Sequence, residues 1–300
     1  MLPSYLEKLT PAELEERAAA LTARLESCNI CPNNCEVNRL EKEEGECMST
    51  DEVAVSSVGP HYGEEPPLVG RLGSGTIFLT GCNLDCIFCQ NYDISHNRRG
   101  ETITTRELAN AMLALQKRGC HNINFVTPTH FTPQIVAALI PAVEGGLEIP
   151  LVYNCGGYES VDTLKLLEGI FDIYMPDIKY SDSQTAQKYS GISNYWDIVR
   201  KALIEMNRQV GTLKISRSGI AQKGLLIRHL VLPNDIAGTE KVLEFIAGEI
   251  SVDSYVNIMD QYRPAFNAYR FDDISRGITV EEYDAAISYA RKLGLHRGFG

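Results

Sequence analysis

Residues 80–91 read TGCNLDCIFCQN and directly follow the apolar run TIFL at positions 76–79. The run has the length and composition of a buried strand, so the sequence predicts three cysteines, Cys82, Cys86 and Cys89, in a loop at the end of a strand. A structural zinc site or a closed iron–sulfur site normally uses four protein ligands. Three thiolates therefore predict a cluster with one metal position left open for a substrate or a cofactor.

Beyond this loop, short apolar runs alternate with amphipathic segments. Six runs have the character of strands: TIFLTG (76–81), NINFVT (122–127), PLVYNC (150–155), DIYMPD (172–177), LLIRHLVL (225–232) and YVNIMD (255–260). Helix starts between and after them are marked by Thr104 with Glu107, Thr132 with Pro133, and Thr279 with Glu282. Apolar strands separated by helices predict an α/β fold with a parallel sheet covered on both faces. Six such units fit an open, partial (β/α)6 TIM-like barrel, with a flat doubly wound sheet as the alternative.

The N-terminal part of the chain follows a different pattern. Thr10, Pro11 and Glu13 predict the start of a helix, whereas the stretch from Cys28 to about residue 74 has few periodic apolar positions. We therefore expect two parts. Residues 1–74 form a helix and an irregular, metal-stapled, cysteine-rich extension, and residues 75–300 form the barrel.

A second cysteine group lies in the N-terminal extension and follows the spacing CxxCPxxCx(11)C. Its members are Cys28, Cys31, Cys35 and Cys47. Four thiolates suit a tetrahedral zinc site, a rubredoxin-like iron site or a second iron–sulfur cubane, and the spacing is compatible with all three. We expect a second metal centre here. Of the two remaining cysteines, Cys120 is expected to be a small buried apolar residue, and Cys155 lies at the end of the third predicted strand.

The composition excludes several classes of partner. With a net charge of -11 and a pI of about 5.1, the chain lacks the clustered Lys and Arg needed to bind nucleic acid or an anionic membrane. No apolar run approaches the roughly 20 residues of a membrane span, and the first ten residues do not resemble an export signal. We therefore expect a cytoplasmic protein, whose nine cysteines are more consistent with metal ligation than with disulfides.

Polar residues gather at the predicted carboxyl ends of the strands, which is where the active sites of (β/α) barrels lie. Thr127 follows the second strand, Asn154 ends the third, and His229 lies on the fifth. Asp177 and Lys179 follow the fourth and are two residues apart, so their side chains are expected on the same face. The sequence thus predicts that several polar side chains converge on one rim of the barrel.

The CxxxCxxC spacing, with Phe88 directly before the last cysteine and a strand directly before the first, resembles the signature of the radical S-adenosylmethionine (radical SAM) superfamily. Within that superfamily, the chain resembles the pyruvate formate-lyase activating enzyme-like branch. The stretches that carry this resemblance are FCQN (88–91), INFVTPTH (123–130), VYNCGGYES (152–160), DIYMPDIKY (172–180), LLIRHLVLP (225–233) and NIMDQYRP (257–264).

This resemblance implies a [4Fe-4S] cluster held by Cys82, Cys86 and Cys89, whose open iron chelates S-adenosylmethionine (SAM). One-electron reduction then cleaves SAM, and the resulting 5′-deoxyadenosyl radical abstracts hydrogen from a substrate. The implied partners are an electron donor such as flavodoxin or ferredoxin and, for an activating enzyme, a protein in which it installs a glycyl radical. A radical SAM enzyme that modifies a small molecule or a peptide is one alternative. A non-catalytic iron–sulfur electron carrier is the other, although a carrier does not need an open iron.

The resemblance also implies residues that contact the cofactor. Asp177 and Lys179 match the Asp-x-Lys that activating enzymes place beside SAM, and His229 falls where related enzymes have a cofactor-contacting histidine. The Gly-Gly-Glu run that many members carry after the second strand is replaced here by residues 127–130, TPTH, so contact there is expected through hydroxyl or backbone groups. The full implied set is Phe88, Thr127, Asn154, Asp177, Lys179 and His229.

Overall fold

The computed structural model describes residues 2–299, and most of its strands form a parallel sheet. The parallel strands are β2 (Ser74–Leu79), β4 (Ile123–Val126), β5 (Leu151–Cys155), β6 (Ile173–Ile178), β8 (Ala221–Leu230) and β9 (Tyr255–Met259). They coincide with the six apolar runs of the sequence. The predicted α/β fold with a parallel sheet is therefore confirmed.

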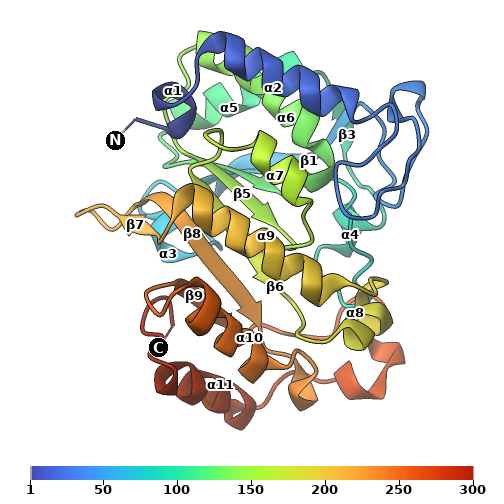
Figure 1. The fold of residues 1–300 in the computed structure, drawn as a ribbon, viewed down its shortest axis with the longest axis vertical. Helices are drawn as coiled ribbons and strands as arrows, with labels where there is room; N and C mark the ends of the chain where they lie inside the picture. Colours follow the sequence, from blue (N-terminus) through green and yellow to red (C-terminus); the bar gives the residue numbers. More distant parts are fainter. Residues whose placement is uncertain (1, 300) are drawn as a thin grey trace.

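The sheet curves but does not close into a full barrel (Figure 1). Two further strands, β1 (Val53–His61) and β3 (Glu101–Ile103), extend the sheet, and the strand order is β3-β1-β2-β4-β5-β6-β8. β9 pairs with β8, and the two-residue β7 (Lys214–Ile215) pairs antiparallel with β8. Within residues 2–299, no strand pairing joins β9 to the strands at the other end of this order. The open, partial barrel predicted from six units is confirmed.

The prediction of an irregular segment between Cys28 and residue 74 is wrong for its second half. β1 (Val53–His61) pairs antiparallel with β2, and β3 (Glu101–Ile103) pairs antiparallel with β1. Val53 and Val55 are buried at alternate positions, as expected of a strand with one covered face. β1 therefore joins the N-terminal extension to the strand that precedes the cysteine loop.

The longer helices pack on the outside of the curved sheet (Figure 1). The longer ones are α2 (Pro11–Ala23), α5 (Thr105–Lys117), α6 (Thr132–Glu144), α7 (Val161–Leu166), α8 (Ser183–Ser190), α9 (Tyr195–Val210), α10 (Thr239–Phe245) and α11 (Val280–Lys292). Short helices are α1 (Ser4–Glu7), α3 (Pro66–Val69), α4 (Tyr92–Ser95), the 3-10 turns Arg39–Glu41, Thr129–Phe131, Pro233–Asp235, Ala268–Arg270 and Asp272–Ile274, and the π turn Ile246–Ile250. The predicted capping boxes at Thr10, Thr104 and Thr279 are all present. No helix in the described chain combines the length and the apolar character needed to cross a membrane.

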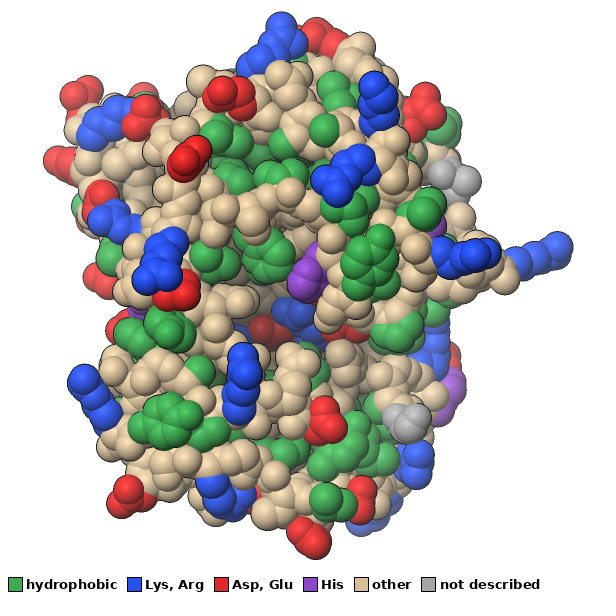
Figure 2. Space-filling view, turned by 180° about the vertical axis from the view of Figure 1, so that it is seen from behind, with side chains coloured by type: hydrophobic (Ala, Val, Ile, Leu, Met, Phe, Trp, Pro, Cys, Tyr) green, Lys and Arg blue, Asp and Glu red, His purple; other side chains and the backbone are tan. Residues whose placement is uncertain are grey.

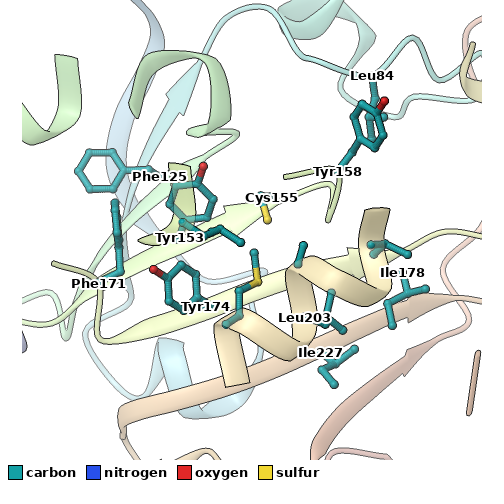
Figure 3. Packing of buried hydrophobic residues seen from close by; sticks show 14 of the residues in the cluster. Leu84, Phe125, Tyr153, Cys155, Tyr158, Phe171, Tyr174, Ile178, Leu203 and Ile227 are labelled. Atoms are coloured by element: carbon teal, nitrogen blue, oxygen red, sulfur yellow. The ribbon is translucent and has the colours of Figure 1, made fainter. Parts of the chain in front are cut away.

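Alternate residues of the parallel strands enter two different apolar clusters. Tyr153 of β5 and Tyr174 of β6 are paired in register and face the helices in the main core (Figure 3). Val152 and Ile173, also paired in register, lie on the opposite face and pack with Leu68 of α3 inside the barrel. Because both faces of these strands are buried, their sequences read as continuous apolar runs. This apolar cluster around Leu68 fills the inside of the barrel. The polar residues lie beyond it, at the carboxyl ends of the strands.

Candidate functional site

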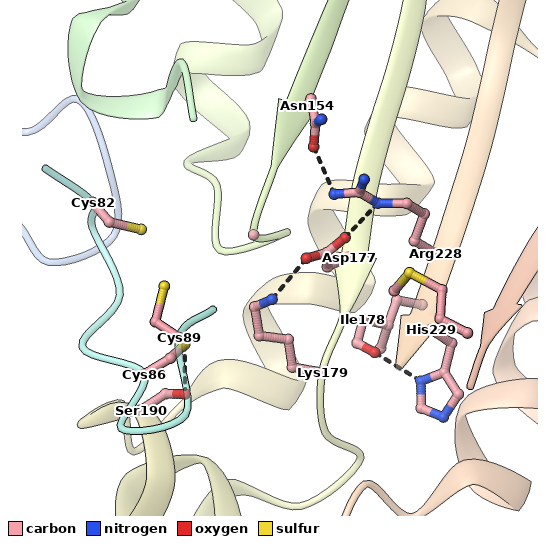
Figure 4. Close-up of polar contacts among 12 residues, drawn as sticks. Cys82, Cys86, Cys89, Asn154, Asp177, Ile178, Lys179, Ser190, Arg228 and His229 are labelled. Carbon is pink, nitrogen blue, oxygen red and sulfur yellow. Dashed lines mark hydrogen bonds and ion pairs between the residues drawn. The ribbon is translucent and has the colours of Figure 1, made fainter. Parts of the chain in front are cut away.

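A cavity of about 220 Å³ lies at the carboxyl ends of the parallel strands. The cysteine loop, residues 80–91, forms one wall, and the polar ends of β5, β6 and β8 form the other (Figure 4). The predicted site residues that line it are Cys82, Cys86, Phe88, Cys89, Thr127, Asn154, Asp177 and Lys179. The structure therefore brings together every predicted residue of this rim except His229. Figure 2 shows that the molecule is hollowed on one side, with acidic and basic side chains in the depth of the hollow.

The three cysteines of the loop are free thiols that face the same cavity. Burial raises the pKa of Cys82 to about 12 and that of Cys86 to about 11, so both thiols must lose a proton when they bind a metal. The Cys89 backbone N–H donates to the Cys86 carbonyl oxygen at 3.1 Å, which folds the second half of the loop into a turn. Within residues 2–299, no group of three or more His, Cys, Asp and Glu side chains is arranged to hold a single metal ion. A cubane differs from a single ion because each of its cysteines binds a different iron, and three thiols on one cavity wall fit a cubane with one open iron.

An ion-pair network occupies the opposite wall (Figure 4). Asp177 accepts from Lys179 Nζ at its Oδ2 and from Arg228 Nε at its Oδ1, both at 2.7 Å, and Arg228 also donates to Asn154 Oδ1 at 2.7 Å. Burial favours the neutral form of Asp177, but Arg228 and Lys179 outweigh it and lower the pKa of Asp177. Burial likewise opposes the charge on Lys179, but Asp177 and Cys86 raise its pKa. The cavity wall opposite the cysteine loop therefore carries two fixed cations, Lys179 and Arg228, both paired with Asp177.

Arg228 is a site residue that the sequence analysis missed. It precedes His229 on β8 and lies in register with Asp177 of β6, so both side chains face the inside of the barrel. His229 is fully buried on the opposite face, where Nδ1 contacts the Ile178 carbonyl oxygen at 2.8 Å and Nε2 contacts Thr239 Oγ1 at 2.9 Å. Burial lowers the pKa of His229 to about 4, so it is neutral at pH 7. The implied contact between His229 and a cofactor does not fit this position.

Two acidic residues reach Arg228 from the loop that follows β1. Glu64 Oε2 lies 3.6 Å from Arg228 Nη1, and Glu65 Oε1 lies 4.0 Å from Arg228 Nε. Glu65 also accepts from Asn257 Nδ2 of β9 at 2.8 Å. Burial raises the pKa of Glu64 to about 7, although Arg228 opposes this rise. Both side chains are buried against the interior arginine, although they belong to an acidic segment that contains Gly and Pro and has the composition of a solvated loop.

Glu159 is a second residue that the sequence analysis missed. It is 2% exposed, and its carboxyl group accepts from Thr129 Oγ1 at 2.7 Å and from Tyr153 OH at 2.9 Å. Burial raises the pKa of Glu159 to about 7, and the Cys155 thiol is a further hydrogen-bonding neighbour. Cys155 itself lines the cavity. A buried acid that takes up or loses a proton near neutral pH therefore lies directly behind the cavity.

The remaining predicted residues have ordinary packing roles as well as access to the cavity. Phe88 makes edge contacts with Tyr180 and Tyr262, at centroid separations of 6.3 and 5.8 Å, which fix its ring under the cysteine loop. Gly156 lines the cavity, and Gly157 has a φ of +77°, where an added Cβ would clash with the Asp177 carbonyl oxygen. A side chain at position 157 would collide with β6, so the glycine pair serves the turn after β5.

The N-terminal cysteines lie near one another. Cys28, Cys31 and Cys47 are buried and Cys35 is half-buried. Burial raises the pKa of Cys31, and the nearby Cys47 and Cys35 add to the rise. The arrangement does not form a single-ion site within the described residues, so the second metal centre stays a prediction.

A second cavity, of about 490 Å³, connects the two cysteine groups, because Cys35 and Cys82 both line it. The segments also touch at Gly81, which has a φ of +76°. A Cβ at this position would lie 2.6 Å from the Cys47 carbonyl oxygen, so only glycine allows the two backbones to approach this closely. The N-terminal extension therefore packs directly against the start of the cysteine loop.

Solved structures of other proteins have a fold similar to that of this chain. The open barrel resembles the structure of HydG, a maturase of the [FeFe]-hydrogenase, with a TM-score of 0.51 and 12% identity over 98% of this chain and 63% of that one. It also resembles Streptococcus suis SuiB bound to the precursor peptide SuiA, with a TM-score of 0.50 and 12% identity over 73% of this chain. The match covers 46% of the SuiB chain, so this protein corresponds to about half of it.

Sequence comparison gives a more similar relative. The chain is 33% identical over 298 residues to the uncharacterized protein MJ0674 of Methanocaldococcus jannaschii, covering 97% of this chain and 82% of that protein. The family model of the radical SAM superfamily matches residues 76–213, from the strand before the cysteine loop to the end of α9 and the turn that follows it. Residues 76–213 of this chain therefore form a domain of the radical SAM superfamily.

Proposed function

We propose that the protein is a radical SAM enzyme of the glycyl-radical activating type, which uses SAM to abstract hydrogen from a protein partner. The superfamily implies a [4Fe-4S] cluster and SAM as cofactors. The observation that carries the proposal is the cavity in which three cysteine thiols face Asp177, Lys179 and Arg228. The resemblance of the DIYMPDIKY and LLIRHLVLP stretches to activating enzymes supports the choice of this subtype.

In this proposal, Cys82, Cys86 and Cys89 hold the cluster. When bound, the cluster and SAM supply one-electron reductive cleavage and a 5′-deoxyadenosyl radical. Lys179 and Arg228 present fixed positive charge to the carboxylate of SAM, because Asp177 holds both cations in place at 2.7 Å.

The other lining residues shape the cavity around the cofactor. Thr127 and Asn154 offer a hydroxyl and an amide to its polar groups, and Phe88 closes the apolar floor of the cysteine loop. Together these side chains exclude water from the site where the radical forms.

The partners follow from the same chemistry. Reductive cleavage needs an electron donor, and flavodoxin or ferredoxin would supply single electrons. A peptide substrate is a second candidate, because SuiB, which shares the fold, is bound to its precursor peptide SuiA. A small-molecule substrate is the third. We also propose a cytoplasmic location, since iron-binding thiols persist in a reducing compartment.

We propose further that residues 1–74 carry a second metal centre at Cys28, Cys31, Cys35 and Cys47, and that residues 75–300 carry the radical chemistry. The shared cavity between Cys35 and Cys82 supports a role of this centre close to the first cluster. A zinc ion there would be structural, whereas an iron centre would be placed to pass electrons to the first cluster.

The test is reduction of the anaerobically reconstituted protein with dithionite in the presence of SAM, followed by chromatography of the products. We expect 5′-deoxyadenosine and methionine from the wild type, none from Cys86→Ala, and wild-type amounts from the control Cys120→Ala, whose thiol lies outside the cavity. An electron carrier would make neither product. An activating enzyme would also produce a glycyl-radical signal in electron paramagnetic resonance (EPR) spectra of a partner protein, whereas an enzyme acting on a small molecule would turn over without one.

A further inference from the structure

The C-terminal end of α8 is docked on the cysteine loop. The backbone N–H groups of Asp85 and Ile87 donate to the carbonyl oxygens of Ser190 and Tyr189, at 3.3 and 3.0 Å. Gly191 ends the helix in the left-handed conformation, with a φ of +73°, directly after Ser190. These contacts fix the position of the last residue of α8 relative to the cysteine loop.

Ser190 uses its side chain on the same loop. Its hydroxyl donates to Cys86 Sγ at 3.0 Å (Figure 4). Its oxygen lies 2.9 Å from the hydroxyl of Tyr180. Ser190 is 1% exposed and Tyr180 is fully buried, so water does not compete for these groups. A serine hydroxyl has one hydrogen. Because that hydrogen is directed at the sulfur, Tyr180 is the donor to Ser190, and the chain of donors runs from Tyr180 through Ser190 to Cys86.

We propose that this Tyr180–Ser190 chain raises the reduction potential of the cluster by hydrogen bonding to Cys86. The inference rests on the cluster site of the proposed function. A cysteine bound to iron has no proton and can only accept, and its sulfur is more negative in the reduced cluster. A fixed donor therefore stabilises the reduced state more than the oxidised state, and hydrogen bonds to sulfur are an established means of setting cluster potentials. Tyr180 strengthens the effect by polarising the Ser190 hydroxyl.

Cys89 has a weaker version of the same contact. Ser95 Oγ lies 3.2 Å from Cys89 Sγ, but it also donates to the Asn91 carbonyl oxygen at 3.1 Å. One hydrogen is thus shared between two acceptors, whereas Ser190 has the sulfur as its acceptor. The structure therefore predicts an order: loss of the Ser190 hydroxyl lowers the potential more than loss of the Ser95 hydroxyl.

The experiment is an EPR-monitored redox titration of the reconstituted full-length protein, with iron and sulfide measured on each sample. We expect Ser190→Ala to lower the midpoint potential enough to reduce the ratio of reduced to oxidised cluster about tenfold at a fixed solution potential, which corresponds to about 59 mV for a one-electron couple. Tyr180→Phe and Ser95→Ala should shift it in the same direction by less. Ser190→Thr, which keeps the hydroxyl, should restore the wild-type value.

Two control variants remove a buried serine or tyrosine hydroxyl that does not contact a cysteine of the cluster. Ser74 donates to Asn122 Oδ1 at 2.6 Å, and Tyr174 donates to Gln209 Oε1 at 2.8 Å, so Ser74→Ala and Tyr174→Phe should leave the potential unchanged. An equal shift in these controls, or an unchanged potential in a fully loaded Ser190→Ala protein, would overturn the inference. If Ser190→Ala does not hold its cluster, Tyr180→Phe and Ser190→Thr decide, because both retain a hydroxyl at position 190.

The outcome is separable from that of the proposed function. A wild type that binds a cluster but does not cleave SAM contradicts the proposed function, and its potential can still be compared with that of the variants. A wild type that cleaves SAM, with a potential insensitive to Ser190 and Tyr180, contradicts only the role of the Tyr180–Ser190 chain.

Discussion

Arg228 of β8 and Asp177 of β6 lie opposite each other in register, with 2.7 Å between Arg228 Nε and Asp177 Oδ1. Glu64 and Glu65 approach the same guanidinium from another loop. Three carboxylates thus share one buried cation, and Lys179 adds a second positive charge that pairs only with Asp177. The inside of the barrel depends on Arg228 for electrostatic balance.

Arg228→Met should therefore destabilise the fold strongly. Removing one partner of a buried ion pair leaves uncompensated charge, and we expect a loss of about 3–5 kcal/mol in the free energy of unfolding, measured by urea denaturation. Arg276→Met removes an exposed partner of Glu282 and should change stability by less than about 1 kcal/mol. Adding Glu64→Gln to Arg228→Met should recover part of the loss. If Arg228→Met is no less stable than the Arg276 control, the network is not structural.

Lys179→Met should weaken SAM binding while leaving the cluster in place. Lys179 lines the cavity and carries one of the two positive charges of its lining, but it donates to Asp177 and not to a cysteine. We expect an increase of about tenfold or more in the Kd for SAM, followed by the change that SAM causes in the EPR spectrum, with unchanged iron content. Loss of iron with unchanged SAM affinity would reject the proposed role of Lys179.

His229→Gln should lower the stability of the protein and leave SAM binding unchanged. His229 is buried among Ile178 and Thr239, outside the cavity, so its substitution should lower the Tm through lost packing and hydrogen bonds. The Kd for SAM measured on the loaded protein should stay at the wild-type value. A selective loss of SAM affinity would restore the cofactor contact that the sequence resemblance implies.

Glu159→Gln should change the pH dependence of stability. The pKa of Glu159 is raised by burial to about 7, so between about pH 4.5 and 7 the folded state holds a proton that the unfolded state has lost. The contribution of Glu159 to the free energy of unfolding is therefore full below pH 4.5 and falls as the pH rises through 7. The substituted amide is neutral at every pH, so the stability of the variant relative to the wild type should rise by about 3 kcal/mol between pH 4.5 and 8.

Urea denaturation at a series of pH values measures this difference. Glu13→Gln provides the control, because hydrogen bonds from the Thr10 backbone and hydroxyl lower the pKa of Glu13 and leave it ionised throughout this range. The relative stability of that variant should stay nearly constant. A flat profile for Glu159→Gln would mean that Glu159 does not titrate in this window.

Cys35→Ser tests the second metal centre. If residues 1–74 bind metal, this variant should lose about one zinc, about one iron or about four irons per chain relative to the wild type, for a zinc site, a rubredoxin-like site or a cubane respectively. The EPR signal of the SAM-binding cluster should remain, because Cys35 is not one of its proposed ligands. Equal metal content in Cys35→Ser and the wild type would remove the second centre from the proposal.

The helices and strands that the sequence predicted correctly are those whose sequence pattern involves residues close together in the chain. The six parallel strands and the capping boxes at Thr10, Thr104 and Thr279 depend on residues a few positions apart, and all are present. β1 was missed because its alternation is short and only Val53 and Val55 are fully buried. An antiparallel strand with one covered face is easily read as loop when it lies among acidic and Gly- and Pro-containing segments.

Most of the cavity wall was predicted, and what was missed depends on distant partners. The motif around His229 did not reveal that Arg228 takes the inward position, because the register with Asp177 of β6 decides it. Glu64 and Glu65 look like solvated loop residues until Arg228 is placed beside them. Glu159 is held by side chains from two other elements, and no spacing in the sequence relates it to them.

A substitution at Gly81 would change how closely the two cysteine-bearing segments pack. A Cβ at this position would collide with the Cys47 carbonyl oxygen. Gly81→Ala should therefore push the N-terminal cysteine segment away from the cysteine loop without changing any cysteine. The distance between the N-terminal extension and the loop at the end of β2 can thus be varied by mutation. The rate at which electrons cross that gap, if the extension holds iron, would fall steeply as it widens.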